Sequence, residues 1–149
     1  MRPSDTLSRH GSFLLALAGA LPLWLILASG VGGAEPHADL AVGYSAAMIA
    51  LLAGLRAGYT MKASGARERR RSVVFAGLLA GVATVATQAP AAVGLSLAIS
   101  CFFVQGLWDV TSIESRQLPA DLAQARLTFI ALAVVPLIGV LGSVVFGRS

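Results

Sequence analysis

Residues 72–108 read SVVFAGLLAGVATVATQAPAAVGLSLAISCFFVQGLW and include no charged side chain. As a single α-helix this stretch would be about 55 Å long, nearly twice the hydrocarbon thickness of a bilayer. Gln88-Ala89-Pro90 interrupts it near the middle, where proline lacks a backbone N–H and restricts the residue before it. We therefore expect two membrane-spanning helices, at 72–89 and 90–109, joined by a turn.

Three further apolar runs flank this hairpin, at residues 12–31, 40–61 and 127–146. Each is long enough to cross the hydrocarbon core as a helix, which takes about 20 residues. A helix pairs its own backbone polar groups, as lipid requires, and the sequence lacks the alternating segments of about ten residues that a transmembrane barrel would show. The sequence therefore predicts an all-α bundle of five transmembrane helices, with residues 1–149 forming one membrane domain.

The composition of the 149-residue chain is that of a membrane protein. Hydrophobic residues make up 56% and charged residues 12%, against about 25% charged in soluble domains, and the mean hydropathy is +0.79. These values exclude an ordinary soluble enzyme and a disordered chain. Cys101 is the single cysteine, which excludes an intramolecular disulfide, and His10 and His37 each stand alone in a polar flank. We expect no metal and no cofactor.

The basic residues indicate the orientation of the chain. Residues 62–71 (KASGARERRR) carry five basic side chains and one acidic one, whereas residues 32–39 carry two acidic side chains and no Lys or Arg. The positive-inside rule places 62–71 in the cytoplasm, together with the N-terminus and the connection at 110–125, and the C-terminus outside. Because the positive charge lies between apolar runs and not along a soluble face, we expect no nucleic-acid partner. The run at 67–71, which orientation alone explains, would also attract anionic lipid headgroups.

The N-terminal region has two interpretations. Residues 1–34 have a basic start, an apolar stretch and small residues at Gly32-Gly33-Ala34, as in a secretory signal peptide whose cleavage would leave four helices. The apolar stretch is longer than the 7–15 residues of a typical signal core, which favours a retained helix. A chain rich in Gly and Ala with the single lysine Lys62 indicates a GC-rich bacterial source, so we expect the bacterial inner membrane.

Arg56 is the most informative charged residue, because it lies inside an apolar run. A charge at the centre of a span costs about 2.5–3.5 kcal/mol on insertion scales. Arg56 lies about 9 Å from the end of its helix, so its side chain could extend to the cytoplasmic headgroups. Alternatively it pairs with Asp109, since the second and fourth helices run in the same direction and place both residues at a similar depth. Arg126 starts the fifth helix at this level, so we expect a polar cluster of Arg56, Asp109 and Arg126 near the inner leaflet.

Small residues recur at a spacing of four. Gly54 and Gly58 form one GxxxG pair, and Gly77 and Gly81 form another. In lipid the close approach of two backbones supplies much of the packing between helices, so such pairs mark contact faces. We expect these four glycines to pack helices within the chain, and the alternative is a face that docks another membrane protein or a second copy. Trp108, at the inner boundary of its helix, is placed as an interfacial anchor.

Three stretches carry a resemblance to a known family. They are Gly19-Ala20-Leu21-Pro22, Tyr44 followed by LLAGLRAG at 51–58, and Asp109 followed by LPADLAQARLT at 118–128. Together they resemble domain of unknown function family 3429 (DUF3429, transmembrane protein 69-like), although Ala57, Asp121 and Leu122 stand where that family has aromatic residues. The resemblance implies a five-helix membrane protein, and the family has no established activity to transfer.

The sequence contains no nucleotide-binding loop, no paired catalytic carboxylates within a span and no nucleophile beside a histidine. We therefore expect a non-enzymatic accessory or scaffold subunit of a larger membrane complex, with the lipid bilayer and another membrane protein or a second copy as partners. The alternative is a small-solute or lipid-associated transporter that uses the cluster of Arg56, Asp109 and Arg126.

Overall fold

The computed structural model describes residues 3–31, 37–63, 65–114 and 120–147. These residues form α-helices and no strand. The helices are α1 (Pro3–Val31), α2 (Ala38–Ala63), α3 (Ala66–Gln88), α4 (Ala91–Glu114) and α5 (Ala120–Phe146). Each of the five contains a segment long and apolar enough to span a membrane. The predicted all-α bundle of five such helices is confirmed.

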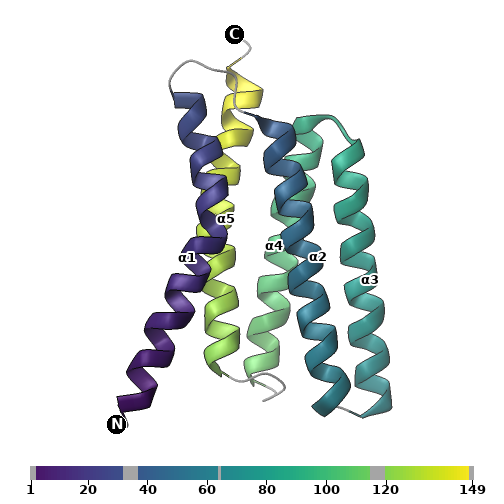
Figure 1. Ribbon diagram of the computed structural model, residues 1–149. Coiled ribbons are helices and arrows are strands. Elements are labelled where there is room, and N and C mark those ends of the chain that lie inside the picture. Colours follow the sequence, from purple (N-terminus) through teal and green to yellow (C-terminus); the bar gives the residue numbers. More distant parts are fainter. Residues whose placement is uncertain (1–2, 32–36, 64, 115–119, 148–149) are drawn as a thin grey trace.

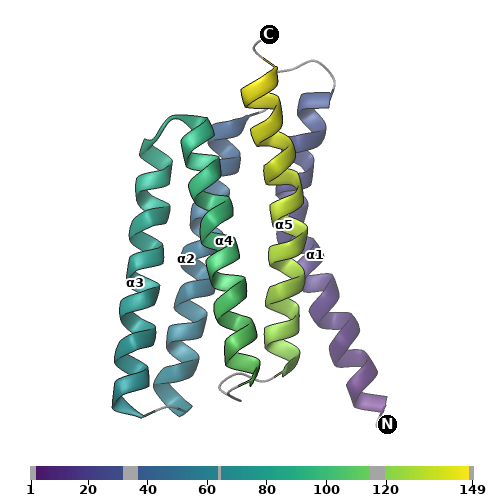
Figure 2. The same ribbon diagram turned by 180° about the vertical axis from the view of Figure 1, so that it is seen from behind.

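The helices stand side by side as a bundle (Figure 1). α1 packs mainly on α5, α3 packs mainly on α2, and α4 contacts α2, α3 and α5 (Figures 1 and 2). The start of α1, the end of α2 and the start of α3 share one end of the bundle with the end of α4 and the start of α5 (Figure 1). The end of α5 lies at the opposite end. The termini of the chain therefore lie at opposite ends of the bundle.

The turn between α3 and α4 lies where proline predicts it. α3 ends at Gln88, and Ala89 takes an extended conformation with φ −84° and ψ 160°, as expected for a residue before proline. The Ala89 N–H donates to the Ala86 carbonyl at 3.4 Å, and α4 begins directly after Pro90. This short turn sets α3 and α4 next to each other.

The helices extend beyond the apolar runs, which corrects several predicted boundaries. α1 begins at Pro3 and not at residue 12, α5 begins at Ala120 and not at residue 127, and α4 continues to Glu114. The arginine-rich run at 67–71, predicted as a loop, forms the first turns of α3. Hydropathy marks where the lipid core ends, whereas polar residues such as arginine continue a helix readily into the headgroup region. The candidate signal-cleavage site at 32–34 lies outside the described residues.

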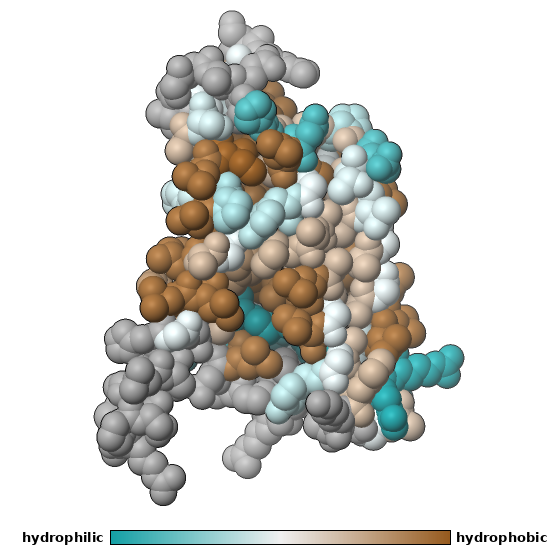
Figure 3. Space-filling view, in the orientation of Figure 1, coloured by the Kyte–Doolittle hydropathy of each residue, from teal (hydrophilic) through white to brown (hydrophobic). Residues whose placement is uncertain are grey.

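The core is built mainly from small side chains between a few large ones. Buried alanines occur on all five helices, and the largest fully buried apolar side chains are Phe102, Leu23, Ile49, Leu95 and Leu137. Many large apolar side chains on the helices face outward. Figure 3 shows brown and pale residues over most of one face of the bundle, with strongly hydrophilic ones at its upper edge and lower right and a smaller hydrophilic spot in the lower middle. An apolar flank between polar ends fits a bilayer.

The four glycines of the GxxxG pairs do not pack inside the chain, which corrects the prediction of intrachain contact. Gly54, Gly58, Gly77 and Gly81 are exposed, and a Cβ built at each meets no atom within 4 Å. Close approaches between two helices occur at three other described glycines. A Cβ would lie 3.1 Å from the Phe129 ring at Gly19, 2.6 Å from the Ala86 carbonyl oxygen at Gly94, and 2.8 Å from Leu27 Cδ1 at Gly139.

Candidate functional site

Asp109 is the centre of a buried ionic cluster. Its side chain is 0% exposed, and its two carboxylate oxygens accept hydrogen bonds from different helices. Arg56 of α2 donates from Nη1 to Oδ1 at 2.8 Å, and Arg126 of α5 donates from Nε to Oδ2 at 2.8 Å. The structure thus brings together Arg56, Asp109 and Arg126, which the sequence analysis expected to meet because they lie at a similar depth. One carboxylate joins α2, α4 and α5.

The side chain of Arg56 points into the bundle. It is 5% exposed and bound to Asp109, so the interpretation that it extends to the headgroups is wrong. The reason is energetic, because a carboxylate in a region of low dielectric constant binds a guanidinium far more strongly than water-screened charges bind each other.

Two side chains of the same layer also bind the backbone of α2. Arg126 donates from Nη1 to the Leu52 carbonyl at 2.7 Å, and Gln105 of α4 donates from Nε2 to the Ile49 carbonyl at 2.9 Å. A carbonyl oxygen has two lone pairs, so it accepts such a bond in addition to the helical one. These bonds fix α4 and α5 against two carbonyls of α2 that lie three residues apart.

The cluster carries an excess of positive charge, because two guanidinium groups face one carboxylate. Removing one partner of a buried ion pair typically costs about 3–5 kcal/mol, since the other charge is left uncompensated. The two losses should differ in size. Loss of Asp109 takes the shared carboxylate from two buried arginines, whereas loss of Arg56 leaves the pair of Asp109 and Arg126. The arrangement is suited to holding three helices together.

Trp108 links this cluster to the arginine-rich start of α3. The Arg56 Cζ lies 4.7 Å from the centroid of its ring and the Arg71 Cζ lies 5.0 Å from it, both within cation–π range. Phe75 stacks on the same ring, with centroids 4.2 Å apart and an interplanar angle of 21°. The sequence predicted only an interfacial anchor here. The sequence signal that could have indicated a contact between Trp108 and the ionic cluster is that Trp108 directly precedes Asp109.

A small cavity adjoins the cluster. Its volume is about 10 Å³, close to the minimum for one water molecule. Arg56, Arg126, Ser72 and Gln105 contribute to its lining. The Ser72 Oγ and the Gln105 Oε1 are buried and have no hydrogen-bond partner in the described part of the chain. Sequence reasoning did not assign Ser72 or Gln105 to the cluster. Hydroxyl side chains in a span also bond to their own helix backbone, as those of Ser96 and Ser100 do, so polarity alone does not mark a shared site.

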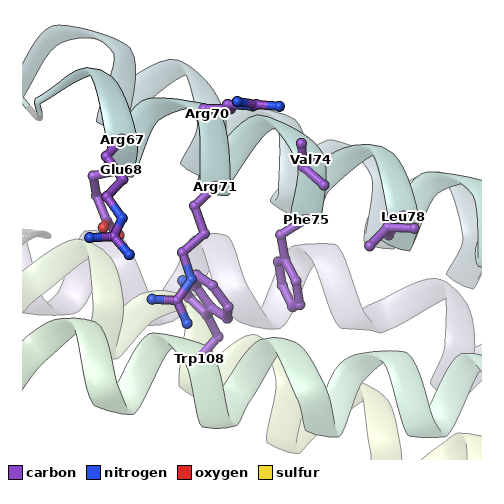
Figure 4. Close-up of a pocket in the computed structure, with 8 residues that line it drawn as sticks. All are labelled: Arg67, Glu68, Arg70, Arg71, Val74, Phe75, Leu78 and Trp108. Atoms are coloured by element: carbon purple, nitrogen blue, oxygen red, sulfur yellow. The ribbon is translucent and has the colours of Figure 1, made fainter.

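A larger cleft opens between α3 and α4, with a volume of about 830 Å³. Figure 4 shows its lining residues, which come from the first turns of α3 and from Trp108 on α4. The lining consists of Arg67, Glu68, Arg70, Arg71, Val74, Phe75, Leu78 and Trp108.

No family model, curated protein or solved structure matches the chain. Within the described ranges no group of three or more His, Cys, Asp or Glu side chains could hold a metal ion. The function therefore has to be inferred from the geometry of the ionic cluster, the cleft and the outward helix faces.

Proposed function

We propose that this multi-pass membrane protein is a non-enzymatic accessory or scaffold subunit of a larger complex in the bacterial inner membrane, with its N-terminus in the cytoplasm. The observation that carries the proposal is a continuous stripe of small, exposed residues on α2. The stripe is formed by Gly43, Ala47, Ala50, Gly54 and Gly58.

The spacing of these residues places them on one helical face about 22 Å long. A Cβ at Gly43, Gly54 or Gly58 would meet no atom of the chain within 4 Å. α4 packs behind α2, as the two opposite views show, so this face is directed away from the bundle (Figures 1 and 2). Since close backbone approach drives association in lipid, the α2 stripe is suited to a helix of another membrane protein.

The interior supports a scaffold. Both oxygens of Asp109 are occupied by arginines, and the cavity beside them has the volume of about one water molecule. A rigid, filled interior presents its outer faces in fixed geometry. The alternative, a transporter that uses Arg56, Asp109 and Arg126, would require these pairs to open during each cycle.

We also propose membership of domain of unknown function family 3429. Residues from the separate stretches that carry the resemblance meet in space, which supports the proposal. The Tyr44 Oη donates a hydrogen bond to the Gly19 carbonyl, and Arg56 pairs with Asp109.

The accessory role is tested by extraction in a gentle detergent followed by native sizing. Gly54→Leu and Gly58→Leu fill the α2 stripe without touching the core, and Ala131→Leu places the same bulk on an exposed position of α5. We expect the wild type and Ala131→Leu to elute with a partner subunit, and the two glycine variants to elute without it.

A monomer in all four samples would count against the proposal. Substrate uptake by proteoliposomes that Asp109→Asn abolishes would favour the transporter instead.

A further inference from the structure

The cleft between α3 and α4 changes from basic to apolar along its length. Arg67, Arg70 and Arg71 lie in the first turns of α3, and Val74 and Leu78 follow on the next turns, with the side chains displayed along α3 in Figure 4. From Arg67 to Leu78 the helix rises about 16 Å, close to the roughly 15 Å of hydrocarbon in one leaflet. The order of polarity is that of a phospholipid, with its headgroup at the start of α3 and its acyl chain toward the bilayer centre.

The basic end of the cleft carries charge that the protein does not neutralise. The lining includes three arginines and one glutamate, so positive charge is in excess. All three arginines are exposed, and none of them forms an ion pair with a carboxylate among the described residues, unlike Arg56 and Arg126. Guanidinium groups suit phosphate oxygens because they offer planar, paired N–H donors.

The wall of the cleft is held in place by the interior. Trp108 lies 5.0 Å from the Arg71 Cζ and stacks on Phe75, and the buried Arg56 lies 4.7 Å from the same ring. The Arg71 guanidinium is thus held beside an aromatic surface, which reduces the entropy lost when it binds a ligand.

We propose that this cleft binds one anionic phospholipid, with its phosphate at Arg71, in the positive potential of Arg67 and Arg70, and an acyl chain along Val74, Phe75 and Leu78. The proposal does not depend on the accessory role. The bound headgroup acts through Arg71 and Trp108 on the ionic cluster, so lipid binding also stabilises the bundle.

The first test is native mass spectrometry of the delipidated full chain with phosphatidylglycerol or phosphatidylcholine of identical acyl chains. The variant Arg70→Gln/Arg71→Gln is compared with Arg69→Gln, which removes an exposed arginine of the same run that does not line the cleft. We expect phosphatidylglycerol to bind more tightly than phosphatidylcholine, and its affinity to fall about fivefold for each arginine removed from the cleft. Arg69→Gln should bind as the wild type does.

A competition experiment with glycerol 3-phosphate distinguishes a site for a phospholipid from a site for a free phosphate compound. We expect it neither to compete with phosphatidylglycerol nor to raise the melting temperature, because it lacks the acyl chain. Equal binding of the two lipids, an equal loss in Arg69→Gln, or full competition by glycerol 3-phosphate would each overturn the proposal.

The second test does not depend on the arginine variants. Trp24 and Trp108 are the two tryptophans of the sequence, so the fluorescence of Trp24→Phe protein comes from Trp108 alone. It is recorded in detergent at limiting lipid, with phosphatidylglycerol or phosphatidylcholine brominated on the acyl chains. We expect the brominated phosphatidylglycerol to quench the fluorescence in a saturable way. Its concentration at half-maximal quenching should be at least fivefold lower than that of the brominated phosphatidylcholine. Identical quenching curves would contradict a specific anionic site.

Discussion

The Arg56 Nη1 of α2 lies 2.8 Å from the Asp109 Oδ1 of α4, although 53 positions separate the two residues in sequence. The pair is buried, and Arg126 occupies the other carboxylate oxygen. Because α2, α4 and α5 meet at this one carboxylate, the cluster sets the relative depth of three helices. Trp108 extends the contact to α3 through Phe75 and Arg71.

The unequal roles within the cluster predict an order of stability. Asp109→Asn removes the carboxylate that both buried guanidinium groups bind and should lower the free energy of unfolding by about 3–5 kcal/mol. Arg56→Gln leaves the pair of Asp109 and Arg126 intact and should cost less. Thermal unfolding in a mild detergent, followed by circular dichroism, measures both. An Arg56→Gln loss that equals or exceeds the Asp109→Asn loss would show that Asp109 is not the shared partner.

Arg126 is predicted to need its guanidinium and not merely its charge. It donates from Nε to Asp109 and from Nη1 to the Leu52 carbonyl, two directions that a lysine ammonium on one stem does not reproduce. We expect Arg126→Lys to cost about 1–3 kcal/mol, whereas Arg69→Lys, at an exposed position, should stay within about 0.5 kcal/mol of the wild type. A wild-type melting temperature for Arg126→Lys would contradict this geometry.

The glycines are predicted to divide by what their Cβ would meet. Gly94→Ala places a methyl group 2.6 Å from the Ala86 carbonyl oxygen, a backbone atom, and should cost about 1–3 kcal/mol through overpacking. Gly54→Ala meets nothing within 4 Å and should be neutral or stabilising, because alanine is the better helix former. Denaturant titration of the two variants side by side distinguishes them, and equal midpoints would contradict the helix packing described here.

The orientation is predicted from charge and can be measured at the chain ends. α1 starts and α5 ends at opposite ends of the bundle, and the basic start of α3 lies at the same end as the start of α1 (Figure 1). We expect a reporter fused to the N-terminus to be active in the cytoplasm and one fused to the C-terminus to be active outside. Reporters that are active on the same side would exclude an odd number of spans.

The number of helices and the position of the ionic cluster could be predicted, because both depend only on the position of each residue along the chain. Charge gaps and Pro90 divide the chain into spans, and the rise per residue places Arg56, Asp109 and Arg126 at one depth. The ends of the helices could not be predicted from hydropathy, because polar residues can also be helical. The first residues of α3, 66–71, are mostly charged and still form part of the helix.

Contacts that depend on helix rotation were not predictable. A GxxxG pair reads the same whether it faces lipid or a neighbour, and Gly54 faces outward while Gly94, in no such pair, approaches a backbone carbonyl. The contact between Trp108 and Arg71 likewise requires knowing that α3 lies beside α4 with those two faces turned toward each other.

The most direct test of the ionic cluster is a double-mutant cycle of Arg56→Gln and Asp109→Asn, with the free energy of unfolding measured for all four proteins. Removing Arg56 from the Asp109→Asn protein takes away one of the two buried positive charges that have lost their shared carboxylate. The double variant should therefore be more stable than Asp109→Asn alone, with a coupling energy of at least about 1 kcal/mol. A double variant whose loss equals the sum of the two single losses would show that the two residues do not act as a pair.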